Sequence, residues 1–109
     1  MAYDEGLAQR IREELDERLD LSEREMFGGL CFMLGGNMCC GVVGEELMVR
    51  VGPDAYAESL ELPYAREMDF TGRTLKGMVY VAVEGIEAGA DLAAWVERGA
   101  EFAGSLPPK

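Results

Sequence analysis

The apolar pattern is most continuous between Met26 and Val43, a stretch that contains no charged residue. It divides into two apolar runs on either side of Gly35-Gly36-Asn37, and these residue types accept the positive φ that a tight hairpin turn requires. We therefore predict a β-hairpin with strands over residues 25–34 and 37–43. The remaining elements are expected to cover this hairpin.

Apolar residues with helical spacing occur near both ends of the chain. Residues 4–20 are expected to form an amphipathic helix with Asp4 as its N-cap, because leucine and isoleucine recur there every four positions. A second helix is expected to have Asp91 as its N-cap and to end at Leu106, before two prolines. Trp95 lies on the apolar stripe of that helix, which predicts a core position for its side chain.

Shorter elements are predicted between these two helices. Alternating apolar residues indicate strands over Leu47–Val51 and Met78–Val83, and Gly52-Pro53-Asp54 is expected to open a short helix that Pro63 closes. Residues 64–78 form the least regular stretch. The order is therefore helix, three strands, short helix, one or two strands, helix. It predicts an α+β fold of one domain, residues 1–109: a two-layer α/β sandwich with one mainly antiparallel sheet packed by the terminal helices.

Composition narrows the functional classes. The formal net charge is −11, which opposes close approach to phosphate backbones, so we expect no direct nucleic acid binding. Nothing in the sequence has the features of a membrane span or of a signal peptide, so we expect a cytoplasmic protein without a membrane partner. The chain contains no histidine, the commonest general base and metal ligand. We therefore expect no enzyme activity, no catalytic residues, no cofactor and no metal site.

All three cysteines, Cys31, Cys39 and Cys40, lie in the predicted hairpin. A two-residue turn would place Cys31 opposite Cys40 and Phe32 opposite Cys39, and neighbouring residues on a strand point to opposite faces. A zinc site would need a fourth ligand. A Cys31–Cys40 disulfide is an alternative, but a cytoplasmic setting favours reduced, buried thiols that act as small apolar fillers.

The predicted hairpin also carries large apolar side chains on both faces, whereas helices on one side of a sheet bury only one face. Residues at its start are therefore candidate contacts for a partner: Met26, Phe27, Gly28, Gly29 and Met33. Alternatively, residues 64–78 of the same chain could cover this face of the hairpin, and the sequence leaves both possibilities open.

A few basic residues stand out on this acidic chain as a candidate patch for an anion or an acidic partner: Arg50, Arg66, Arg73 and Lys76. Ordinary scattered surface charge is the favoured interpretation, because Glu67 and Asp69 lie in the same stretch.

Five segments carry a family resemblance. Residues 24–29 read REMFGG, 36–38 read GNM, 47–51 read LMVRV, 77–81 read GMVYV, and 92–96 read LAAWV. Together they resemble the N-terminal domain of the TfoX/Sxy competence regulators over nearly the whole chain. The resemblance implies an α/β sandwich similar to type III secretion chaperones, and it implies no catalytic residues.

Full-length regulators of that family act as co-activators of DNA-uptake genes, together with the cyclic-AMP receptor protein, and carry a second, C-terminal domain. We expect this chain to be a stand-alone version of the first domain. The resemblance favours a non-enzymatic regulatory module that binds a protein partner, which could be a second copy of the chain. The alternative is a small-molecule-binding or thiol-responsive domain that uses the hairpin over residues 26–43.

Overall fold

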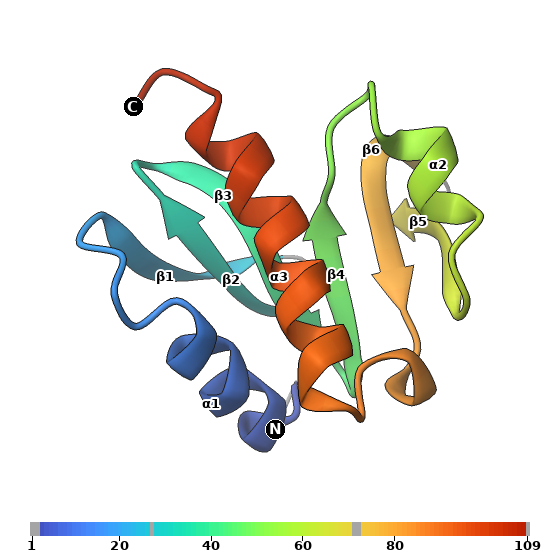
Figure 1. Ribbon diagram of the computed structural model, residues 1–109, viewed down its shortest axis with the longest axis horizontal. Coiled ribbons are helices and arrows are strands. Elements are labelled where there is room, and N and C mark those ends of the chain that lie inside the picture. The colour runs from blue at the N-terminus through green and yellow to red at the C-terminus, as the bar shows by residue number, and fades with distance from the viewer. Residues whose placement is uncertain (1–2, 27, 71–72, 109) are drawn as a thin grey trace.

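The computed structural model describes residues 3–26, 28–70 and 73–108. Within them, six strands form one antiparallel sheet with the order β1-β2-β3-β4-β6-β5 (Figure 1). The strands are β1 (Leu21–Met26), β2 (Gly29–Leu34), β3 (Asn37–Val43), β4 (Glu46–Arg50), β5 (Ala65–Phe70) and β6 (Arg73–Val81). The helices are α1 (Glu5–Glu14), α2 (Tyr56–Leu60), the single 3-10 turn η1 (Val83–Gly85) and α3 (Gly89–Gly104). The predicted α+β class is confirmed.

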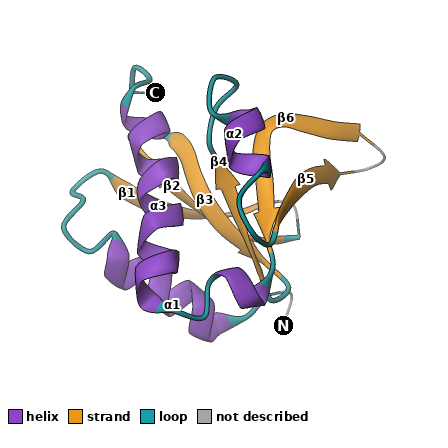
Figure 2. Cartoon of the chain, turned by 45° about the vertical axis from the view of Figure 1, so that its right-hand side comes forward, coloured by secondary structure: helices purple, strands orange, loops and turns teal. Residues whose placement is uncertain are grey.

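All three α-helices pack on the same face of the sheet. Figure 2 shows α1 and α3 lying over one side of the strands, while α2 lies against the end formed by β5 and β6. The core between these layers contains Ile11 of α1, Phe32 of β2 and Trp95 of α3. Within the described residues, no helix is long and apolar enough to cross a membrane.

The opposite face of the sheet has a core of different composition. Six buried residues make up this second core, which we call the methionine cluster: Cys31, Met33, Met38, Met48, Met68 and Met78. Met26 and Tyr80 are half-buried against it. Methionine is unbranched and flexible, so it fills irregular gaps on a face that none of the described helices covers.

The predicted first helix is shorter than expected, and a strand follows it. Asp4 is its N-cap, and its carboxylate accepts hydrogen bonds from the backbone N–H of Gly6 and Leu7 at 2.8 and 3.2 Å. The helix ends at Glu14, however, and Leu19 is fully exposed. The chain then enters the edge strand β1, which we did not predict and whose four middle residues are exposed.

Three other predicted boundaries also require correction. The strand expected over residues 25–34 is divided between β1 and β2, because the chain reverses between Met26 and Gly29. The stretch expected to be irregular, residues 64–78, contains β5 and most of β6. The last helix begins at Gly89 and its N-cap is Ala88, so Asp91 lies inside its first turn and does not cap it.

The register between β2 and β3 also differs from the predicted one. Met33 pairs with Met38 as expected, but an irregularity follows, after which Phe32 pairs with Cys40 and Cys31 with Gly41. Cys39 is the additional residue of this β-bulge. Because of the bulge, Cys39 and Cys40 both lie in the helix-side core, whereas Cys31 belongs to the methionine cluster. The predicted pairing of Cys31 with Cys40 is therefore wrong.

Helix α3 lies in close contact with the sheet at Gly99. A Cβ atom added there would lie 2.4 Å from the backbone oxygen of Cys39 and 3.2 Å from its Sγ. The Cys39 thiol also donates a hydrogen bond to the Val96 carbonyl oxygen at 3.8 Å. Glycine at position 99 is thus what allows the helix backbone to lie directly on β3.

Candidate functional site

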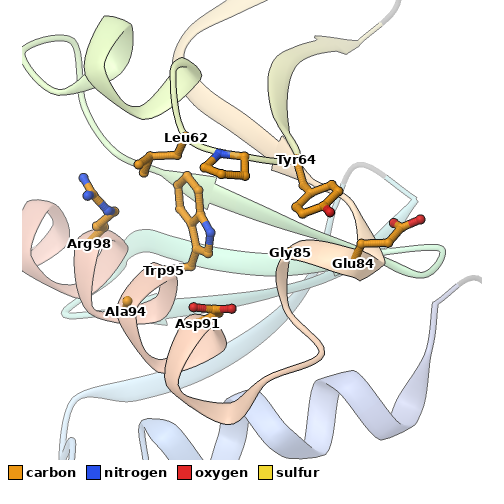
Figure 3. Close-up of a pocket in the computed structure, with 9 residues that line it drawn as sticks. Leu62, Tyr64, Glu84, Gly85, Asp91, Ala94, Trp95 and Arg98 are labelled. Carbon is orange, nitrogen blue, oxygen red and sulfur yellow. The ribbon is translucent and has the colours of Figure 1, made fainter.

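A pocket of about 350 Å³ lies where α3 meets the chain entering β5 and the turn η1 (Figure 3). We call it the Trp95 pocket. Its lining comes from three segments that are far apart in the sequence: Leu62, Pro63 and Tyr64; Glu84 and Gly85; and Asp91, Ala94, Trp95 and Arg98. Figure 3 shows Trp95 in the middle of this set, with Tyr64 and Glu84 to one side and Arg98 to the other.

The two aromatic residues of the pocket differ in exposure. Trp95 is 6% exposed and belongs to the helix-side core, which confirms the predicted core position, yet its indole also lines the pocket. Tyr64 is 56% exposed. The exposed tyrosine and the edge of the buried tryptophan line the same pocket, and aromatic residues of these two types are enriched at protein interfaces.

The backbone of Tyr64 has an unusual conformation. Its φ is 67°, a left-handed value that costs a residue with a Cβ roughly 1–2 kcal/mol. The carbonyl oxygen of Tyr64 accepts a hydrogen bond from the N–H of Ala82 at 3.0 Å. Gly85 also leaves room for the tyrosine, because an added Cβ at position 85 would lie 2.9 Å from the Cβ of Tyr64. The surrounding chain therefore fixes the backbone of Tyr64 at the rim of the pocket.

Three charged side chains line the pocket. Arg98 stacks over the Trp95 ring at 5.6 Å and donates a hydrogen bond to the Glu58 carboxylate at 3.4 Å. The positive charge of Arg98 is thus partly balanced from outside the pocket. Glu84 and Asp91 are both exposed, and among the described residues neither forms an ion pair. The pocket consequently has an acidic rim.

The predicted partner-contact residues lie elsewhere, around the connection from β1 to β2. Gly29 and Met33 are buried, Met26 is half-buried and Gly28 is exposed. Phe27 lies outside the described residues. Of the described members of this group, only Met26 and Gly28 offer surface to a partner in the isolated chain.

The predicted basic residues do not gather into one patch among the described side chains. Arg50 stacks on Phe102 of α3 at 5.2 Å. Arg66 donates a hydrogen bond to Glu46 at 2.6 Å and stacks on Tyr80 at 4.8 Å, next to the methionine cluster. Lys76 is exposed. The side chain of Arg73, the fourth member, lies outside the description.

The cysteines are free and buried. Burial raises the pKa of Cys31 to about 11. A hydrogen bond with the Cys39 side chain, followed by burial, raises the pKa of Cys40. Within residues 3–26, 28–70 and 73–108, no group of three or more cysteine, aspartate and glutamate side chains is arranged to hold a metal ion. The thiols therefore have the environment of structural cysteines.

We expect all three thiols to be reduced and slow to react in the folded protein. Only the thiolate is a nucleophile, and the raised pKa values of Cys31 and Cys40 keep those two thiols protonated near pH 8. Titration with a thiol reagent in denaturant, without reductant, should count three thiols, and the native protein should react much more slowly. A count of one would show a disulfide.

Our sequence reasoning missed the Trp95 pocket, although part of its signal is present. Asp91, Ala94, Trp95 and Arg98 follow the spacing i, i+3, i+4, i+7, which places them on one face of a helix. Because we expected Asp91 to cap the helix, we did not place it on the same helix face as Ala94, Trp95 and Arg98. The contribution of Tyr64 depends on how β5 and η1 meet in space, and no local pattern reports that.

Comparison with known proteins identifies the family of the chain. The family described as the TfoX N-terminal domain matches residues 13–103, which is most of the chain. No curated protein and no solved structure matches the sequence.

Proposed function

Because the chain belongs to the TfoX N-terminal domain family, we propose that it is a non-enzymatic regulatory module that acts by binding a protein partner. Membership of this family supports a role in the regulation of competence genes, in which the domain works through another protein and does not contact DNA itself. The composition supports the second part of this proposal, because lysine and arginine supply the affinity for phosphates and here 10 of them stand against 21 acidic residues.

The observation that carries the proposal is the Trp95 pocket. It combines an exposed tyrosine in a costly backbone conformation with a tryptophan at its base. Backbone strain persists where the surrounding structure enforces it, and strained residues concentrate at functional sites. Tyrosine, tryptophan and arginine are also the residues that contribute most to protein–protein affinity.

The residue types present support a binding role over a catalytic one. The chain has no histidine, and its three cysteines are buried. The charged groups of the pocket are two exposed carboxylates and an arginine that already contacts Trp95 and Glu58. Among the described residues, the lining contains no serine, threonine or cysteine, so the pocket offers no hydroxyl or thiol nucleophile of the kind that an adjacent base activates.

A photo-cross-linker tests the proposal directly. Replacing Tyr64 by p-benzoylphenylalanine in living cells places the reactive group at the rim of the pocket. We expect irradiation to give one discrete covalent adduct, because a partner that covers the pocket must lie against this ring. The mass of the adduct will identify a second copy of the chain or a different protein.

The matched control is the same substitution at Leu19, a large apolar residue that is fully exposed and lies on no pocket described above. It controls for non-specific capture by an exposed hydrophobic group. The absence of any adduct at position 64, or the same set of adducts at both positions, would rule out a partner at this pocket.

A further inference from the structure

We infer that the Trp95 pocket recognises a basic side chain of its partner, with an arginine as the best fit. This inference rests on the proposed function, in which the occupant is a protein, and it specifies the chemistry of the contact. Three features of the pocket lead to it: its aromatic surface, its acidic rim and its size.

The aromatic surface attracts cations. The face of a tyrosine or tryptophan ring carries partial negative charge and attracts a cationic group within about 6 Å of the ring centre. The described part of the chain uses this contact three times, with Arg50 on Phe102, Arg66 on Tyr80 and Arg98 on Trp95. No such arginine is recorded over Tyr64 within the described residues. The exposed ring of Tyr64 thus offers a face of the same kind to an incoming guanidinium.

The acidic rim selects for positive charge. Glu84 and Asp91 are contributed by η1 and α3, and Figure 3 shows Glu84 next to the Tyr64 ring and Asp91 below Trp95. Arg98 is the only basic residue in the lining, and Glu58 partly balances it. Both carboxylates would repel an anionic ligand, whereas a guanidinium can form a charge-assisted hydrogen bond with either of them.

Size and overall charge favour a single side chain as the occupant. A volume of about 350 Å³ lies at the small end of the range for ligand pockets. The net charge of −11 would also draw a basic segment toward the protein. Arginine fits better than lysine because its planar guanidinium stacks on aromatic rings and pairs with carboxylates through two hydrogen bonds.

The only tryptophan of the chain is Trp95, so its fluorescence reports directly on this pocket. The probe is a capped pentapeptide of glycines with one central arginine, added at low ionic strength. The control peptide carries citrulline, which has nearly the same shape without the charge. We expect a saturable fluorescence change with the arginine peptide and at least tenfold weaker binding of the citrulline peptide.

Substitutions test each contact separately. Asp91→Asn and Glu84→Gln should each weaken binding about two- to fivefold, which is the contribution of a partly exposed charge pair. Tyr64→Gly removes the ring and suits the left-handed backbone, so the variant should fold and bind about two- to fivefold more weakly. Glu13→Gln is the control, because it changes the net charge by the same amount as Asp91→Asn. Glu13 is an exposed residue of α1 that does not line the pocket, so this variant should bind the peptide as the unaltered protein does.

Equal binding of the two peptides, or equal loss of affinity in Glu13→Gln and Asp91→Asn, would overturn the inference, because either result would mean that no specific charge contact forms. If the peptide fails to bind while the Tyr64 cross-link persists, the inference of a basic side chain is wrong, but the proposal of a protein partner is retained. If the peptide binds as expected and no cross-link forms, the pocket does bind a basic side chain, but the proposal of a protein partner is wrong.

Discussion

Replacing Trp95 by alanine is expected to lower the free energy of unfolding by about 3–5 kcal/mol, the usual cost of truncating a large buried aromatic residue. The indole is 6% exposed and packs in the helix-side core together with Leu92 and Val96 of the same helix. Its removal takes away this packing and enlarges the adjoining pocket. Urea unfolding followed by far-ultraviolet circular dichroism will measure the loss, since the variant contains no tryptophan.

Tyr64→Gly is the matched control for this experiment, because Tyr64 lines the same pocket but is 56% exposed. Its substitution should change the free energy of unfolding by less than about 1 kcal/mol, since a surface ring is lost while backbone strain is relieved. A loss below about 1 kcal/mol for Trp95→Ala would place the indole outside the core.

Replacing Gly99 by alanine is expected to destabilise the protein by about 1–3 kcal/mol, the range of overpacked core substitutions. In most helices the same change is favourable by about 1 kcal/mol, because alanine is the better helix former. Here the new methyl group would lie 2.4 Å from the carbonyl oxygen of Cys39, so α3 would have to move away from β3. Chemical denaturation will give both the sign and the size of the change in the free energy of unfolding.

Gly104→Ala is the control on the same helix, where an added Cβ has no atom within 4 Å. It should leave stability unchanged or raise it slightly. If Gly99→Ala stabilised the protein as much as Gly104→Ala, the close approach of α3 to the sheet would be wrong.

The elements with uninterrupted periodicity could be predicted from the sequence, and those at the sheet edges could not. The alternation in Leu47–Val51 and the helical stripe around Trp95 correspond to β4 and α3. Strand β1 was missed because its middle residues are polar and exposed, as an edge strand allows. Leu19 continues the four-residue spacing of Leu7, Ile11 and Leu15, and this suggested a longer helix although Leu19 lies outside the core.

The arrangement of the cysteines shows why local rules do not determine a register. A two-residue turn correctly predicts that Met33 pairs with Met38. The bulge that follows turns Cys39 toward α3, where its thiol reaches the Val96 carbonyl oxygen. That contact involves residues 57 positions apart, so the hairpin sequence alone could not reveal it. The Trp95 pocket escaped prediction for the same reason.

The two cores differ in how much sequence change they can accommodate over evolution. At Gly99 the backbones of α3 and β3 lie in direct contact, so almost any side chain at that position forces whole elements apart. The methionine cluster is built from flexible side chains that can change rotamer and keep the space filled when a neighbour changes size. The residues of the methionine cluster can therefore change type more freely during evolution, while position 99 of α3 must remain a glycine for the helix to keep its place on β3.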